Sequence, residues 1–203
     1  MFIDRWHEVV EPRLEEASLP PTALQSLCIH CANHALNIAE VHYWTDTPSS
    51  SWATLRQIIQ SYQKWIDEGR PKDVAPLRTL MRNLLNELED DEEDRPSTWS
   101  QMADGLHHAL ELVLGDTEDR GEFVLAAGSL HHSFEALQQA EISQNMIPIA
   151  PPGAAEDVAA SLMSMTPGSV ESSEFLTREI DFQLACIERL QAEASLGDDS
   201  DPV

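Results

Sequence analysis

Apolar residues recur every three or four positions along most of this chain, and that spacing restricts the fold more than any other feature. The pattern is clearest in residues 51–68. One face of the helix predicted there carries Trp52, Leu55, Ile58, Ile59, Tyr62, Trp65 and Ile66. Glycine is absent from residues 1–68, and the apolar–polar alternation typical of half-buried strands is missing throughout. The sequence therefore predicts an all-α protein.

Turn and capping residues divide the chain into about seven predicted helices. Pro20-Pro21-Thr22 separates the first two, and Gly69-Arg70-Pro71 has the order typical of a helix end. Pro12 should kink or divide the first helix, and two adjacent apolar faces predict a central helix over 22–44. Short connections favour antiparallel neighbours, so we predict an antiparallel helical bundle. The expected helices span about 2–18, 22–44, 51–68, 73–89, 95–114, 118–142 and 171–196.

Residues 143–172 depart from the helical pattern. They contain four of the twelve prolines, at Pro148, Pro151, Pro152 and Pro167. Because proline breaks helices, this segment is predicted to be a linker with room for one short helix. We therefore divide the chain into a helical bundle over 1–142, the linker over 143–172, and an amphipathic helix over 173–197 that packs on the bundle.

The cysteines and the apolar runs together indicate the cellular compartment of this protein. No apolar run approaches the roughly 18 residues that a membrane span requires, and charges interrupt the first residues too early for a signal peptide. Cys28, Cys31 and Cys186 are too few and too unevenly spaced for a disulfide framework. We expect a cytoplasmic protein in a reducing compartment.

The charge of the chain is large and unevenly distributed. It carries 36 acidic and 12 basic residues, for a formal net charge of −24. Residues 1–86 are nearly neutral, whereas 87–203 hold 26 of the acids and four arginines, and the run 87–94 has seven acids in eight positions. Such a field disfavours binding to nucleic acid and to anionic membranes. We therefore expect a basic protein partner.

A Cys-x-x-Cys motif overlaps a His-x-x-x-His motif in residues 28–34. Zinc ligands must converge on one point. On a helix, however, Cys28 and Cys31 point into the apolar face, whereas His30 and His34 lie on a separate polar stripe. The favoured interpretation is that the cysteines are part of the core and that the histidines contact a neighbouring helix or line a small polar groove.

A six-residue pattern occurs twice, 24 residues apart. The two copies are Leu106-His107-His108-Ala109-Leu110-Glu111 and Leu130-His131-His132-Ser133-Phe134-Glu135. Metal sites in helical bundles pair carboxylates and histidines on facing helices, but their usual order is Glu-x-x-His, which is reversed here. We therefore predict no metal and no cofactor. If a metal were bound, its candidate ligands would be His107, His108, Glu111, His131, His132 and Glu135.

The favoured interpretation of this repeat is that its histidines lie on helix surfaces and pair with their own acidic neighbours. An acidic field should then raise the histidine pKa values above the ordinary value of about 6.5. No Gly-x-Ser-x-Gly, P-loop or Gly-x-Gly-x-x-Gly motif is present, so we expect no catalytic residues and no enzymatic activity.

Three segments between about residues 25 and 70 carry a resemblance to a known family. They are Cys31-Ala32-Asn33-His34-Ala35-Leu36-Asn37-Ile38-Ala39-Glu40, Leu55-Arg56-Gln57-Ile58-Ile59 and Trp65-Ile66-Asp67-Glu68-Gly69. This stretch resembles the all-helical immunity proteins of bacterial polymorphic toxin systems. The resemblance implies a cytoplasmic inhibitor that binds one toxin and has no catalytic activity of its own.

The charge distribution leads independently to an inhibitor. Toxins that attack nucleic acids are often cationic, and carboxylates can take the place of phosphates in a basic cleft. We expect the last helices of the bundle, their connections and the run 87–94 to contact such a partner. The predicted contact residues are Glu87, Glu89, Asp90, Asp91, Glu92, Glu93, Asp94, Glu111, Asp116, Glu118, Asp119 and Glu122.

Two other classes stay open at this point. A metal-dependent helical-bundle enzyme would require the two copies of the repeat to converge on one metal. An adaptor or secretion chaperone would use the last amphipathic helix and the proline-rich linker to hold an apolar segment of an effector.

Overall fold

The predicted all-α fold is confirmed. A computed structural model describes residues 2–42, 49–68, 75–76, 78–79, 81–83, 98–115, 121–145 and 174–198. No strand occurs within these ranges, and the described residues between 75 and 83 are helical. The longer helices are α1 (Phe2–Ala17), α2 (Pro21–His42), α3 (Ser49–Glu68), α5 (Thr98–Leu114), α6 (Glu122–Asn145) and α8 (Glu174–Asp198).

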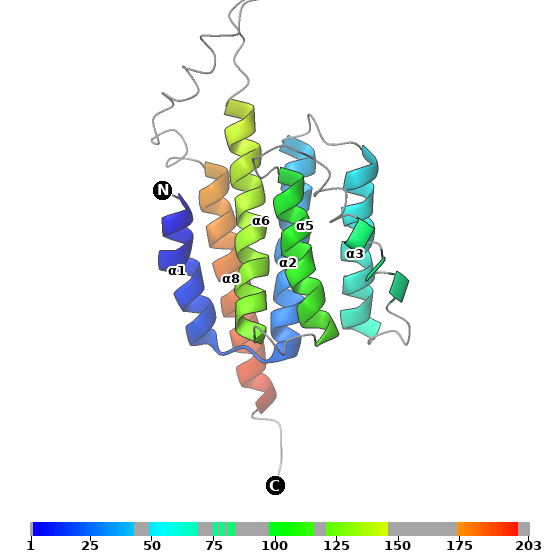
Figure 1. Cartoon of the computed structure of the whole chain (residues 1–203). Coiled ribbons are helices and arrows are strands. Elements are labelled where there is room, and N and C mark those ends of the chain that lie inside the picture. Colours follow the sequence, from blue (N-terminus) through cyan, green and yellow to red (C-terminus); the bar gives the residue numbers. More distant parts are fainter. Residues whose placement is uncertain are drawn as a thin grey trace, which may run out of the picture.

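These helices form an antiparallel bundle with α2 and α6 at its centre (Figure 1). Figure 1 shows α1, α3, α5 and α8 running in one direction and α2 and α6 in the other. Helix α2 packs against α3, α5, α6 and α8, whereas α6 packs against α1, α2, α5 and α8. The last helix, α8, therefore contacts the earliest part of the chain, as the predicted packing of a C-terminal helix on the bundle requires.

The central place of α2 follows from its sequence, as predicted. Side chains all along this helix are buried, and several of them are small, which lets neighbouring helices approach closely. Those on α2 with an exposed fraction of 1% or less are Leu27, Cys28, Ile29, Cys31, Ala32, Ala35, Leu36 and Ala39.

The connection between α5 and α6 depends on two glycines. Gly115 and Gly121 have φ angles of 74° and 78°, in the left-handed region that side chains with a Cβ disfavour. Helix α6 therefore begins at Glu122, four residues later than predicted, and it extends to Asn145. The predicted end of this helix at residue 142 is therefore too early by three residues.

The other predicted boundaries agree with the structure to within about three residues where they are described. Helix α1 is continuous from Phe2 to Ala17 and contains Pro12, so the expected division of this helix is wrong. The predicted helix over 73–89 is described only between residues 75 and 83, and residues 146–173 lie outside the described ranges.

Helices α5 and α6 pack at close range through a reciprocal contact. A Cβ added at Gly105 would lie 3.2 Å from both the Cβ of His132 and the carbonyl oxygen of Ser129. A Cβ added at Gly128 would lie 3.1 Å from Cδ2 of His108. Each helix therefore presents a glycine to a histidine of the other.

We expect Gly105→Ala to lower the free energy of unfolding by about 1–2 kcal/mol, because the overpacking outweighs a gain in helix propensity of about 1 kcal/mol. Gly128→Ala should cost less, because its close neighbour is an imidazole that can rotate rather than a backbone atom. Urea unfolding of both variants measures the difference. If Gly105→Ala were as stable as the wild type or more stable, the close contact between α5 and α6 at this glycine would not limit their packing.

Candidate functional site

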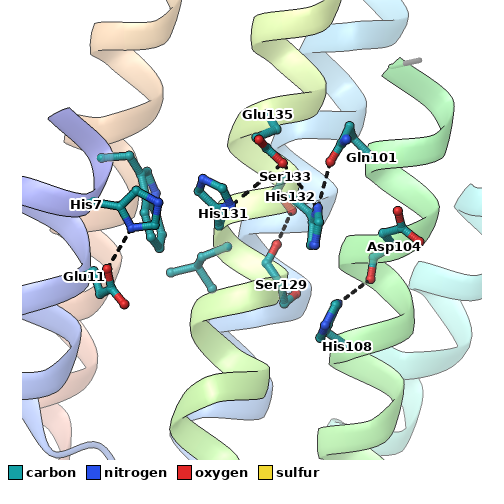
Figure 2. A network of polar contacts seen from close by, with 12 residues as sticks. His7, Glu11, Gln101, Asp104, His108, Ser129, His131, His132, Ser133 and Glu135 are labelled. Atoms are coloured by element: carbon teal, nitrogen blue, oxygen red, sulfur yellow. Dashed lines mark hydrogen bonds and ion pairs between the residues drawn. The ribbon is translucent and has the colours of Figure 1, made fainter. Parts of the chain in front are cut away.

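The two copies of the histidine repeat face each other between α5 and α6. Figure 2 shows His108 on α5 directed toward α6, where His132 lies. Their rings stack with centroids 5.2 Å apart and planes inclined by 22°. The structure therefore brings together the second histidine of each copy, which sequence spacing alone did not establish.

Each stacked histidine is held by an oxygen of α5. Nδ1 of His108 lies 2.9 Å from the carbonyl oxygen of Asp104, one turn earlier. Nδ1 of His132 lies 2.7 Å from Oε1 of Gln101 and 3.4 Å from Oε2 of Glu135. These two histidines are thus parts of the helix interface, and the predicted surface position is wrong for them.

The first histidine of each copy pairs with the glutamate four residues later. The distance from Nδ1 to Oε2 is 3.9 Å for His107 and Glu111, and 3.8 Å for His131 and Glu135. The predicted pairing with an acidic neighbour on the same helix is therefore confirmed for the first histidines. The predicted surface position is wrong for His131, whose side chain is 19% exposed.

His131 also extends the network to α1. Its ring lies 4.8 Å from the rings of Trp6 and His7, centroid to centroid. Nδ1 of His7 in turn lies 2.7 Å from Oε2 of Glu11 (Figure 2). Nε2 of His131 is buried and has no hydrogen-bond partner among the described residues. The histidine network therefore crosses three helices.

This network does not form a metal centre. Within the described ranges, no three side chains of His, Cys, Asp or Glu converge on a point where they could hold a metal ion. The six candidate ligands are divided instead. His108 and His132 stack between α5 and α6, while His131 faces α1 and His107 and Glu111 line a separate pocket. The sixth, Glu135, lies between His131 and His132, with Oε2 3.8 and 3.4 Å from their Nδ1 atoms.

Burial acts on the pKa values of three histidines. It lowers the pKa of His30, His108 and His131 below the ordinary value, and this effect exceeds the opposing influence of Glu111 on His108 and of Glu135 on His131. The expectation that the acidic field raises histidine pKa values is therefore wrong for these three. Desolvation acts directly on a buried imidazole, whereas carboxylates in solvent are screened.

A second polar cluster lies between α2 and α8 and centres on Glu179, whose side chain is 0% exposed. Oε2 of Glu179 lies 2.7 Å from Nδ1 of His34. Nε2 of Gln183 donates to Oε1 of Glu179 over 3.0 Å and to the carbonyl oxygen of Leu130 over 3.2 Å. Nε1 of Trp6 donates to Oε1 of Gln183 over 2.9 Å. This cluster joins α8 to α1, α2 and α6.

Burial raises the pKa of Glu179, while the hydrogen bond and the charge of His34 act in the opposite direction. Sequence reasoning missed this glutamate. The available signal was the apolar face that begins at Leu176, because Glu179 and Gln183 occupy positions three and seven residues later on that face.

The predictions for residues 28–34 are confirmed. Cys28 and Cys31 are fully buried, and none of the described cysteines forms a disulfide. The ring of Phe182 on α8 stacks on His34 with a centroid distance of 3.6 Å and on His30 at 5.6 Å. The polar stripe of α2 therefore contacts a neighbouring helix.

Most of the predicted partner-binding residues cannot be placed, because 87–94 and 116–119 lie outside the described ranges. Glu122 is partly exposed at the start of α6. Glu111 lines a pocket of about 320 Å³ that also contains two arginines of the helical stretch before α5. The pocket is lined by Arg78, Met81, Arg82, His107, Leu110, Glu111 and Leu114.

Comparisons with protein families, with curated proteins and with solved structures give no match for this chain. Among the described helices, none combines the length and the apolarity that crossing a bilayer requires. The fold and the polar clusters define a helical-bundle protein with a partly polar interior, and its function has to be inferred from its own residues.

The lowered pKa values of His108 and His131 predict a loss of stability in acid. Below about pH 6.5 the unfolded chain binds protons that the folded state resists, so the free energy of unfolding falls as pH decreases. The loss is at most about 2 kcal/mol per histidine between pH 6.5 and 5. The groups that act on these two histidines are His7, Glu11, Asp104, His107, Glu111, His132 and Glu135.

Urea unfolding at pH 7 and pH 5 tests this dependence. His108→Gln and His131→Gln should each lose less stability than the wild type over this interval. His107→Gln is the comparison in the same motif. Because His107 acts on His108 only through its charge, this variant should reduce the loss less than His108→Gln does. A wild type that is equally stable at both pH values, with variants that behave identically, would contradict the prediction.

The contact between His34 and Glu179 predicts a second pH dependence of stability. Here the effect of a substitution should be larger at pH 7 than at pH 5. His34→Ala removes the group that offsets the burial of Glu179, so the pKa of Glu179 rises further. We expect a loss of about 2–4 kcal/mol at pH 7 and a smaller loss at pH 5, where Glu179 is more easily protonated. His34→Gln keeps a donor and should lose less. If His34→Ala lost the same free energy of unfolding at both pH values, His34 would not stabilise the charged form of Glu179.

Proposed function

We propose that this protein is a binding protein that captures a cationic protein partner, and that it acts as the inhibitor of a toxin with a basic, nucleic-acid-binding cleft. The observation that carries the proposal is the charge distribution. Residues 87–203 hold 26 acids and four arginines, and seven of these acids are consecutive or nearly so in 87–94. The likeness of residues 25–70 to immunity proteins favours the same class.

The described acidic side chains support a long-range field. Of those whose burial is described, only Glu179 is buried, and the others reach solvent in part or in full. Exposed carboxylates contribute to the potential around the protein and raise the rate at which an oppositely charged partner associates. The excess of exposed carboxylates would not raise the association rate of a partner with little net charge.

Acidic side chains of α1 and α8 are partly neutralised by arginines of the same helices. Arg13 lies 3.2 Å from Glu16 and 3.4 Å from Glu188, and Arg189 lies 3.8 Å from Glu193. The run 87–94, by contrast, is followed by a single arginine, Arg95. We therefore assign the partner contact to 87–94 and 116–122 rather than to α1 and α8.

Glu111 is not retained in the proposed contact, because it shares its pocket with Arg78 and Arg82. Positive charge from the same chain thus lies on the pocket that Glu111 lines, and it lowers the negative potential there. The metal-dependent enzyme is not favoured, since the candidate ligands do not converge within the described ranges. No observation on the described helices favours an adaptor or a secretion chaperone.

The charge proposal predicts an association rate that depends steeply on salt. The partner to test is the product of the neighbouring reading frame, measured by stopped-flow fluorescence between 50 and 500 mM NaCl. Replacing the seven acids of 87–94 by Asn and Gln should lower the association rate constant at 50 mM by about tenfold or more and flatten its salt dependence.

A matched variant separates a local contact from net charge. It replaces six exposed acids of α1 and α8, and it should slow association much less than the 87–94 variant. Equal effects of the two variants would show that total charge alone is responsible. A rate that does not change with salt, or a neighbouring product without a basic domain, would contradict the proposal. The six control residues are Glu8, Glu15, Glu16, Asp181, Glu188 and Glu193.

A further inference from the structure

A pocket of about 320 Å³ lies between helix α5 and the short helical stretch before it. The described residues that line it are at positions 107, 110, 111 and 114 on α5 and at positions 78, 81 and 82 on the earlier stretch. Both sets have the spacing of three and four residues that places side chains on one face of a helix. Two helix faces therefore meet at this pocket, and their packing forms it.

The lining of the pocket changes from apolar to charged. Its apolar members are buried, with exposed fractions of 2% for Met81, 4% for Leu110 and 5% for Leu114. Arg78 and Arg82, by contrast, are exposed to solvent. The pocket therefore has an apolar inner wall and a rim that carries two guanidinium groups.

The charges around the pocket are positive in sum. Arg78 and Arg82 are charged at every physiological pH, because the guanidinium group does not lose its proton. They stand against one carboxylate, that of Glu111, whose Oε2 lies 3.9 Å from Nδ1 of His107. In a chain of net charge −24, this pocket is thus a local site of positive charge.

We propose that this pocket binds a small carboxylic acid with an apolar body, of which a medium-chain fatty acid is the simplest example. The carboxylate contacts Arg78 and Arg82, since the planar guanidinium donates paired hydrogen bonds to a carboxylate. The apolar body packs on the buried inner wall. The inference concerns a different ligand from the basic protein proposed above and does not depend on it.

The size of the pocket limits the size of the ligand. Its volume lies near the lower end of the range of about 300–1,000 Å³ that is typical of small-molecule sites. A ligand as small as octanoate should bind with a Kd of about 0.2–5 mM. Octanol lacks the charge and acetate lacks the apolar body, so each should bind at least about fivefold more weakly than octanoate.

Nuclear magnetic resonance of the full chain with labelled methionine methyl groups tests the site. Titration with sodium octanoate at pH 7 should shift the signal of Met81 until it saturates. The signal of Met102, which is buried on α5 and does not line the pocket, should stay in place. The spectrum of Met81→Leu identifies the Met81 signal. Octanol, acetate and inorganic phosphate are the comparison ligands.

Two double variants test the role of the arginines. Arg78→Gln with Arg82→Gln should weaken octanoate binding by at least about tenfold and leave octanol binding unchanged. The matched control is Arg13→Gln with Arg189→Gln, which changes the net charge equally but replaces exposed arginines of α1 and α8. It should keep the Kd for octanoate within about twofold of the wild type. Circular dichroism shows that each variant is folded.

A third variant should bind more tightly, which a folding defect would not produce. Glu111→Gln removes the negative charge from the lining of the pocket. We expect it to lower the Kd for octanoate by about two- to fivefold and to leave the Kd for octanol unchanged, because only the anion is repelled by this carboxylate.

Several results would overturn the proposal. One is a Met81 signal that does not shift at ten times the expected Kd for octanoate. Another is binding of octanol, acetate or phosphate as tight as that of octanoate, which would exclude the pairing of a carboxylate with an apolar body. Octanoate binding that survives the replacement of Arg78 and Arg82, or that weakens in Glu111→Gln, would exclude recognition by the charges of the rim.

Discussion

A carboxylate removed from water governs how the last helix joins the bundle. Burial of Glu179 is unfavourable unless its oxygens are hydrogen-bonded, and His34 and Gln183 supply those bonds. Gln183 is bound in turn by Trp6 and by the carbonyl oxygen of Leu130. A shift of α8 by one turn would leave these groups unsatisfied, whereas apolar contacts alone would tolerate it. The cluster therefore selects the register of α8 against three other helices.

The histidine repeat has a similar role between α5 and α6. Its second histidines stack on each other, and each lies against a glycine of the opposite helix. Residue types that are common in metal sites serve here to fill a close helix interface. Desolvation of His108 and His131 also reverses the expected direction of their pKa shifts, because it opposes protonation of these imidazoles more strongly than the carboxylates of Glu111 and Glu135 favour it.

Acidic side chains and cysteines have opposite environments in this molecule. Apart from Glu179, the acidic side chains whose burial is described reach solvent, where they contribute to the potential around the protein. The thiols of Cys28, Cys31 and Cys186 lie inside the bundle, each residue with an exposed fraction of 5% or less. The charged groups and the thiols therefore occupy different parts of the bundle.

The sequence by itself determined the all-α class, the central place of α2, most helix boundaries and the burial of Cys28 and Cys31. Those properties depend on apolar spacing and capping within a few consecutive residues, which the sequence displays directly. It also singled out the histidine repeat, but not how the two copies meet. Only the tertiary structure decided that Glu179 is buried and that it meets His34, because such contacts depend on the register between helices that are distant along the chain.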